Sequence, residues 1–239
     1  MKRAPNTQPP FQNSILAGLS REAYARFAPH LEAVSLPVGQ VLSDAGGIIS
    51  HAYFINSGMV SVVAALRDGN TLEVGVIGRE GVVDINLLLG GEITFNRVIV
   101  QVAATALRMK AKVLIRLSNE SGSHLRGIGQ RYVQYRVNQT SQSAICNNAH
   151  EIEARLARWL LTTADTVGED RFALTHEFLS QMLGARRSSV TLAAGALSHA
   201  GVIEYHRGRI LILNRASLAG LACECYTTLN REFIAIRNA

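Results

Sequence analysis

The feature that most constrains the fold is a change in residue pattern near Lys110. Before it, from Val34 to Leu107, short segments rich in β-branched residues alternate with Gly and Asp-Gly turns. After it, apolar residues recur at spacings of three and four, which is typical of helices. A run of strands followed by a run of helices predicts an α+β fold.

The strand-rich part predicts a sandwich or a barrel-like roll, because it contains several short strands with regular turns. Its clearest hairpin is SVVAAL–RDGN–TLEVGVI, where Asp68 and Gly69 are expected to supply the positive φ values of a tight turn. A short helix with Ser20 as its N-cap is expected before it, near residues 20–32. The expected strands are Val38–Leu42, Ala52–Ile55, Met59–Leu66, Leu72–Ile77 and Val98–Ala103.

A long helix over about residues 118–148 is predicted to close a first domain of residues 1–148. Its residues at heptad spacing form a seam that can pack against a copy of itself and so build a two-fold homodimer. The alternative is a helix packed on its own domain. The predicted dimer seam consists of Leu125, Ile128, Tyr132 and Tyr135.

The second domain, residues 149–239, begins with a helix near residues 150–165 that carries Trp159 as a core residue. The most informative segment follows, LTHEFLSQMLGARRSSVTLAAGALSHAGVIEYHRGRILIL. Thr175 is the N-cap candidate of a short helix, and Gly184 falls where a tight turn needs a residue without a Cβ. A second helix opens at Arg186 or Arg187 and ends near Gly201.

The residues after that second helix, EYHRGRILIL, predict two strands about Arg207 and Gly208. Helix, turn, helix and a two-stranded wing form a module that reads DNA, with its second helix in the major groove. The alternative is a solvated polar face on an ordinary pair of helices. The residues predicted to contact double-stranded DNA are Thr175, Arg186, Arg187, Ser188, Ser189, Thr191, Arg207 and Arg209.

Positive charge is concentrated in this segment. Residues 175–215 contain five arginines and two glutamates, whereas all residues from 149 onward have a net charge of only +1. An Arg side chain donates two hydrogen bonds to guanine, and hydroxyls serve phosphates or base edges. The placement of the charge favours a polyanionic partner.

The order of β-roll, long helix and winged motif resembles the family of the cyclic-AMP receptor protein and the fumarate–nitrate regulator (Crp/Fnr). The resemblance is most specific in LTHEFLSQMLGARRSSVTLAAGALSHAGVI, and YFINSGMVSVV, EVGVIGREG and RVIVQVAATALRM support it. It implies an N-terminal double-stranded β-helix of the cyclic-nucleotide-binding type. It also implies a homodimeric transcription regulator that binds a near-palindromic operator and recruits or blocks RNA polymerase.

The resemblance carries over to single positions of the second helix. Arg187 stands where family members read guanine. Ser188 and Leu192 stand where cAMP-type members place Glu and a second Arg. We therefore expect the operator sequence to differ from theirs.

The resemblance also locates a degenerate effector cassette. Cyclic-nucleotide binders carry a Gly-Glu-Leu turn and an Arg-Ser/Thr-Ala stretch, which here read Val83-Asp84-Ile85 and Arg97-Val98-Ile99. Thr140 and Ser141 fall near where such members present hydroxyls to the adenine. We therefore expect an effector that is not cAMP and whose identity stays open. The cassette residues are Asp84, Arg97, Thr140 and Ser141.

Arg97 has an alternative role, an ordinary salt bridge on the roll with Glu80 or Glu92. Three cysteines are too few for a self-contained cluster with four thiolates, and the seven histidines lack metal-binding spacing, so no metal site and no cofactor are predicted. Cys223 and Cys225 are expected to be buried, with a redox or metal role left open.

Catalysis is not expected, because the chain contains no Ser/His/Asp order, phosphate loop or paired carboxylates. No apolar run is long enough to span a bilayer, and the first residues lack the pattern of a secretory signal, so we expect a cytoplasmic protein without a membrane partner. The alternative function is a cyclic-nucleotide-binding signalling module whose C-terminal unit contacts protein instead of DNA.

Overall fold

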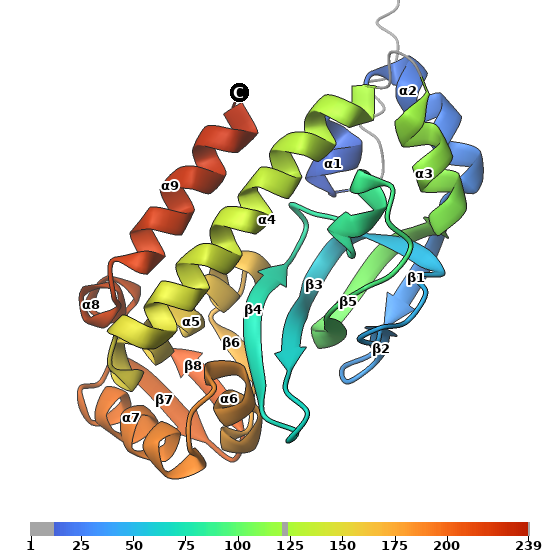
Figure 1. The fold of residues 1–239 in the computed structure, drawn as a ribbon. Coiled ribbons are helices and arrows are strands. Elements are labelled where there is room, and N and C mark those ends of the chain that lie inside the picture. Colours follow the sequence, from blue (N-terminus) through green and yellow to red (C-terminus); the bar gives the residue numbers. More distant parts are fainter. Residues whose placement is uncertain (1–11, 121–123, 239) are drawn as a thin grey trace, which may run out of the picture.

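The computed structural model describes residues 12–120 and 124–238, and Figure 1 shows their arrangement. A strand-rich unit forms one side of the molecule, a long helix (α4) runs across it, and a helical unit with a small sheet lies at the lower end of α4. This order confirms the predicted α+β fold. No helix in the described ranges is long and apolar enough to cross a membrane.

The strand-rich unit is an antiparallel roll whose strands follow the order β1-β5-β3-β4, with β2 paired to β5. Short helical segments precede it and one follows β4: α1 (Ser14–Ala17), α2 (Arg21–Phe27), η1 (Ala28–His30) and η2 (Ile85–Leu89). Ser20 caps α2 as expected, since its hydroxyl accepts the Ala23 N–H at 3.2 Å. The strands are β1 (Glu32–Leu36), β2 (Val41–Ser43), β3 (His51–Ala65), β4 (Thr71–Ile77) and β5 (Arg97–Lys110).

Three strand predictions need correction. The segments expected at Ala52–Ile55 and Met59–Leu66 form one strand, β3, because a bulge at Ser57 to Met59 keeps the chain paired with β5 through Gly58. The strand expected from Val38 begins only at Val41, since Gly39 adopts φ +84° in a turn. β1 was not expected. It pairs along β5 from Glu32 to Leu36.

The β3–β4 hairpin forms where it was predicted, but its turn is longer than two residues. Gly69 has φ +87°, whereas Asp68 does not adopt a positive φ. Instead the Asp68 carboxylate accepts the Asn70 backbone N–H at 2.9 Å, and Leu66 N–H donates to the Asn70 carbonyl at 2.8 Å. An aspartate that bonds backbone two residues ahead is a common turn-former.

The residues of the predicted dimer seam face the chain's own roll. α4 spans His124–Ala149, and the separate α3 (Ala111–Asn119) ends at Glu120, whose backbone is extended. Leu125, Tyr132 and Tyr135 are buried within the chain's own core, against the roll. The Tyr132 hydroxyl donates to the Val82 carbonyl at 3.2 Å. Heptad spacing predicts that one face of a helix is buried, but it does not identify the surface that buries it. In this structure that surface is the roll.

Ile128, the fourth member of that seam, is partly buried against the same core. The alternative raised by the sequence, a helix packed on its own domain, is therefore the observed arrangement.

The second half of the chain shares a core with the roll. Trp159, Leu156 and Leu160 of α5 pack with Met59 and Val63 of β3 in one cluster that continues through the helices and sheet beyond α5. The elements of this half are α5 (Ile152–Val167), β6 (Arg171–Ala173), α6 (His176–Leu183), α7 (Arg187–His199), β7 (Ile203–His206), β8 (Arg209–Ile212), α8 (Arg215–Leu221) and α9 (Cys225–Asn238).

A buried carboxylate joins the two halves. Glu73 of β4 accepts hydrogen bonds from the Ser61 hydroxyl at 2.6 Å and from the Trp159 indole N–H at 2.7 Å. Burial raises the pKa of Glu73 to about 7, although both donors and the charges of Arg158 and Arg136 oppose the rise. The chain therefore retains a titratable group at the interface between roll and winged unit.

This carboxylate predicts a pH dependence of stability. Because the pKa of Glu73 is higher in the folded chain (about 7) than its ordinary value of 4.5, the folded state holds the proton more tightly, and the free energy of unfolding falls as pH rises from 4.5 to 7. The loss is about 3 kcal/mol at 1.36 kcal/mol per pH unit. Urea denaturation of the parent and Glu73→Gln at pH 5 and pH 8 measures it, since comparison with the variant cancels other groups.

The variant is expected to lose less stability than the parent over this interval. Glu32→Gln, at an exposed carboxylate on β1 that pairs with Arg108, is the control and is expected to keep the pH dependence of the parent. Equal losses in the parent and in Glu73→Gln would contradict the assignment.

Candidate functional site

α6 and α7 form the predicted helix-turn-helix, and side-chain caps set its geometry. The Thr175 hydroxyl accepts the Phe178 N–H at 3.1 Å, which confirms Thr175 as the N-cap of α6. Gly184 ends α6 at φ +55°, and a Cβ there would lie 2.7 Å from the Leu72 side chain of β4. Glycine therefore serves both the tight turn and the close approach of the roll.

α7 begins at Arg187, with Arg186 as its cap residue. Its solvent-exposed face contains polar residues and one leucine. Arg186, Arg187, Ser188 and Thr191 are exposed, whereas Ser189 is half-buried. Leu192 lies on the same exposed face with 74% of its surface accessible. Val190, Ala193, Ala194 and Leu197 are buried on the opposite face and anchor the helix.

The wing forms about Arg207 and Gly208, as predicted. These residues adopt φ +46° and +75°, the left-handed pair that a two-residue hairpin of type I′ requires. His206 pairs with Arg209 across the hairpin, and β6 adds a third strand beside β8. The Arg207 and Arg209 side chains are exposed beside the turn.

His176, which the sequence analysis did not select, ties the helices to the wing. Its ring stacks on Tyr205 of β7 with centroids 4.4 Å apart and planes at 12°. Its Nδ1 lies 3.1 Å from the Thr191 hydroxyl. Burial, assisted by the charge of Arg187, lowers the pKa of His176 and favours its neutral form. Because His176 and Tyr205 are far apart in the chain and belong to no local motif, no sequence signal reveals this contact.

A cavity of about 200 Å³ lies where the resemblance places the effector, between the roll and α4. Asp84 and Thr140 line it, as the sequence analysis expected. Asp84 adopts φ +62° and accepts a hydrogen bond from the Ser43 hydroxyl, and burial raises the pKa of its carboxyl group. The Thr140 hydroxyl points to the Val74 carbonyl at 3.4 Å.

The other two cassette residues do not line the cavity, which corrects the sequence analysis. Arg97 forms a double hydrogen bond with Asp44 at 3.0 Å for each contact, so neither expected partner, Glu80 or Glu92, holds it. Ser141 donates to the Val137 carbonyl of its own helix at 3.0 Å. Neither residue type reveals which way the side chain turns, and the structure decides it.

The cationic residue at the cavity is Arg136 of α4, which the sequence analysis did not select. Its side chain is buried, lines the cavity, and donates to the Val76 carbonyl and to the Gln139 amide oxygen. Gln139 in turn packs against Gly75, where a Cβ would lie 2.3 Å from its amide oxygen. Arg136 therefore connects α4 to β4 directly beside the cavity.

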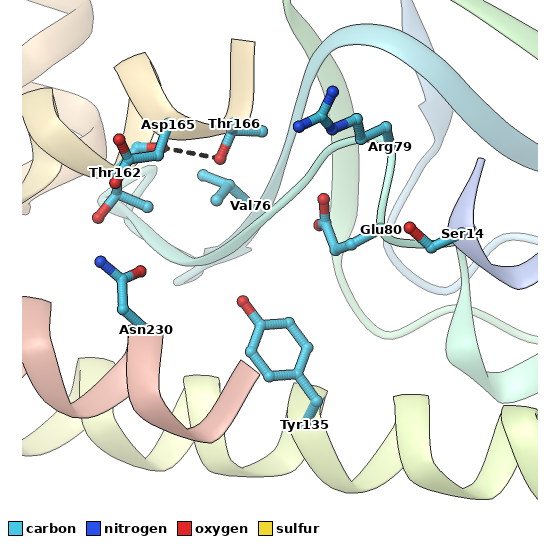
Figure 2. A pocket seen from close by; sticks show the side chains of 9 residues that line it. All are labelled: Ser14, Val76, Arg79, Glu80, Tyr135, Thr162, Asp165, Thr166 and Asn230. Carbon is cyan, nitrogen blue, oxygen red and sulfur yellow. Dashed lines mark hydrogen bonds between the residues drawn. The ribbon is translucent and has the colours of Figure 1, made fainter. Parts of the chain in front are cut away.

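A second, smaller cavity of about 120 Å³ lies between the roll, α4, α5 and α9. Figure 2 shows Tyr135 of α4 and Asn230 of α9 on one side and Arg79 and Glu80 on the other. Burial raises the pKa of the Glu80 carboxyl group.

Comparison with known proteins assigns both halves of the chain. Residues 33–121 match the model of the cyclic nucleotide-binding domain, and residues 154–221 match that of the Crp-like helix-turn-helix domain. These ranges contain the roll and the α6–α7–wing unit described above. No curated protein matches the chain.

Solved structures show the same architecture over nearly the whole chain. A putative Crp/Fnr-family transcriptional regulator from Eubacterium rectale is 16% identical, with a TM-score of 0.66 over 85% of this chain and 94% of that one. A Crp/Fnr-family regulator from Thermus thermophilus is 24% identical, with a TM-score of 0.64 over 80% and 98%. The global regulator CLP of Xanthomonas campestris is 16% identical, with a TM-score of 0.65 over 82% and 100%.

The two domain matches, their order, and the wing and helix geometry agree with one another. The chain belongs to the Crp/Fnr family of DNA-binding transcription regulators.

Proposed function

We propose that the protein acts as a homodimer on a near-palindromic operator, with α7 in the major groove and the wing on the phosphate backbone. The observation that carries the proposal is the exposed face of α7 followed by the exposed arginines of the wing. Arg187 opens the helix and is suited to two hydrogen bonds with guanine, whereas Leu192 is suited to the methyl group of thymine. Arg207 and Arg209 are suited to phosphates.

The remaining residues predicted to contact DNA form two groups, which differ in whether their side chains are free to reach DNA. Arg186 and Ser188 are exposed, and their roles at phosphates or base edges follow from the position of α7. Thr175 and Thr191 are exposed, but their hydroxyl groups already contact the Phe178 N–H and His176 respectively, and Ser189 is half-buried. We assign these three a positioning role in the interface.

The proposal predicts that substitutions of base-reading and of phosphate-binding arginines have different effects on DNA binding. Arg187→Ala is expected to cost about 1–3 kcal/mol per half-site on the preferred operator and to abolish discrimination at one base pair. Arg209→Ala is expected to weaken all duplexes alike and to reduce the salt slope by about 0.9 per lost contact. Fluorescence-anisotropy titrations on a selected operator and a scrambled duplex at several salt concentrations measure both.

Arg21→Ala, at an exposed arginine on α2 far from α6 and α7 (Figure 1), is the matched control and is expected to bind like the parent. If Arg187→Ala lost the same free energy on both duplexes, Arg187 would not read a base. Unchanged binding by Arg187→Ala and Arg209→Ala together would contradict the proposed docking of α7 and the wing.

We infer that the dimer contact lies on the face of α4 that points away from the roll. Exposed residues recur there at spacings of three and four: Gly127, Gln130, Gln134, Val137, Ser141 and Ala144. Val137 is 54% exposed in the single chain, and small or uncharged neighbours permit close approach of a second helix. We infer that this stripe replaces the seam expected from the sequence.

Val137→Glu is expected to shift the protein from dimer to monomer at micromolar concentration, because two carboxylates would be brought together across a two-fold axis. Leu66→Glu, which places the same charge on another exposed apolar residue, is the control and is expected to leave the mass unchanged. Size-exclusion chromatography with light scattering gives the mass. A parent that is already monomeric would contradict the dimer.

We propose that the effector is not cAMP. Asp84 stands where cyclic-nucleotide binders place the longer Glu of the ribose turn. Arg97, at the position of their phosphate-binding Arg, is paired with Asp44 outside the cavity and has Val98 in place of the neighbouring hydroxyl residue. The structurally similar regulator from Xanthomonas campestris is described as responsive to c-di-GMP, so a signal other than cAMP has precedent in this fold. The identity of the effector of this chain stays open.

Calorimetry is therefore expected to show no micromolar binding of cAMP. Each missing charge-assisted hydrogen bond costs roughly 1.5–3 kcal/mol, and two of them weaken binding by about 10²-fold or more. Arg97→Ala is expected to show the same absence of binding as the parent. A micromolar dissociation constant that Arg97→Ala abolishes would contradict both the proposal and the position of Arg97.

The proposed regulator acts by binding and not by catalysis, in agreement with the character of its family. We further propose RNA polymerase as a partner and the cytoplasm as its location, since transcription takes place there in bacteria.

A further inference from the structure

The three cysteines of the chain gather at one point together with a histidine. Cys146 and His150 lie one helical turn apart at the end of α4, so their side chains share one face. Cys223 lies between α8 and α9, and Cys225 is the first residue of α9. The donor atoms of these four residues all lie within 4.8 Å of one another. Figure 1 shows α9 running alongside α4 above this point.

We propose that Cys146, His150, Cys223 and Cys225 form a tetrahedral site for a single zinc ion that fastens the C-terminal helix to α4. Three thiolates and one imidazole are a donor set that structural zinc sites use. A closed set of four protein ligands is typical of a structural site, with no position left for a reacting molecule.

Two of the distances between donor atoms are close to those that one ion imposes. Zinc binds sulfur at about 2.3 Å and nitrogen at about 2.0–2.1 Å, so tetrahedral angles place two sulfurs about 3.8 Å apart and sulfur and nitrogen about 3.6 Å apart. Cys146 Sγ and Cys223 Sγ are 3.5 Å apart, and Cys225 Sγ and His150 Nδ1 are 3.6 Å apart. A four-iron cluster has its ligands on four separate iron atoms and so requires a wider cage than this one.

The surroundings of the four residues also favour a metal. The Nε2 atom of His150 lies 3.0 Å from a carboxylate oxygen of Glu224, which leaves Nδ1 to face the sulfurs. A carboxylate behind the imidazole is the usual outer partner of a metal-bound histidine. The Gln142 amide donates to Cys225 Sγ at 3.0 Å, as expected for a sulfur that carries negative charge.

Two arginines of α5 lie near the cluster and offset its negative charge. Three thiolates and one divalent cation leave a net charge of −1, which a buried site needs to neutralise. Arg158 interacts electrostatically with Cys146 and Cys223, and Arg155 does so with the same two sulfurs. Both arginines are buried, and their Nε atoms have no hydrogen-bond partner among the described residues.

The site would connect α4, which is proposed to carry the dimer face, to the segment that follows the winged unit. Cys146 and His150 end the helix proposed to carry the dimer face, and α5 begins two residues after His150. Cys223 and Cys225 hold the segment that follows the winged unit. A bound ion therefore fixes α9 against α4 and limits how far the winged unit can move from the roll.

Metal binding by the full-length chain tests the proposal. The protein is purified in reducing buffer, stripped with a chelator and titrated anaerobically with cobalt(II), then with zinc. We expect one cobalt per chain, with sulfur-to-cobalt charge-transfer absorption and the visible bands of a tetrahedral ion, and we expect zinc to displace it. A chain that takes up no cobalt, or that binds it without sulfur charge transfer, would overturn the proposal.

Variants assign the ligands. Cys223→Ser and His150→Ala are expected to lose the tetrahedral spectrum, whereas His199→Ala, a histidine at the exposed end of α7, is the matched control and keeps it. Glu224→Gln disturbs only the outer partner, so it is expected to keep the spectrum and to weaken zinc affinity by roughly 10–100-fold. Retention of full affinity by Cys223→Ser would overturn the assignment even if the parent binds metal.

Two further outcomes would replace the zinc site with another chemistry. A reduced chain that binds no metal but forms a Cys146–Cys223 disulfide on mild oxidation would make these residues a redox pair. Reconstitution with iron and sulfide to more than one iron per chain would make the site a cluster. None of these readouts uses DNA, so their failure and the failure of the proposed function are distinguishable.

Discussion

The packing of one face of α4 against the roll is the contact on which the other features depend. Leu125, Tyr132 and Tyr135 are buried there, and Arg136 donates a hydrogen bond to β4 beside the cavity between the roll and α4. Burial of apolar surface contributes roughly 25 cal/mol per Å², so covering this face stabilises the chain before any partner binds. The opposite face of α4 is thereby left exposed, and this is the face proposed to contact a second subunit.

The same packing sets the direction of the chain after α4. α5 follows within three residues and enters a core that contains side chains of both the roll and the winged unit. Glu73 and Trp159 join these parts by a hydrogen bond across the boundary, and Leu72 fits against Gly184 at the turn between α6 and α7. Residues of the roll therefore lie directly against the helix pair that is proposed to bind DNA. A change in the charge of Glu73, or a ligand bound in the roll, would act close to that pair.

Two clusters bring together residues that are far apart in the chain and that form specific contacts only in the folded structure. His176 is ordinary by type and spacing, yet it joins α6, α7 and β7 through Tyr205 and Thr191. Cys146 is separated by 77 residues from Cys223, and only the packing of α9 along α4 brings their sulfurs to 3.5 Å. Neither contact is encoded by a local motif, because the distance along the chain carries no information about which helices pair.

The sequence by itself determined the elements whose formation depends on local chemistry. The cap at Thr175, the turn at Gly184 and the hairpin at Arg207 and Gly208 follow from side-chain oxygens and permitted φ values, which neighbouring residues settle. The β3–β4 hairpin and the burial of Trp159 follow from the periodicity of apolar residues. Fold class and family were therefore accessible without coordinates.

Tertiary structure alone decided which surface covers each apolar face and which partner each charge takes. The spacing of Tyr132 and Tyr135 predicted a buried stripe, but the roll and not a second helix buries it. Arg97 was expected at an effector and pairs with Asp44, while Arg136, which has no motif, lines the cavity. The physical reason is that burial and ion pairing depend on distances between elements, and these distances exist only once the roll, α4 and α9 have packed.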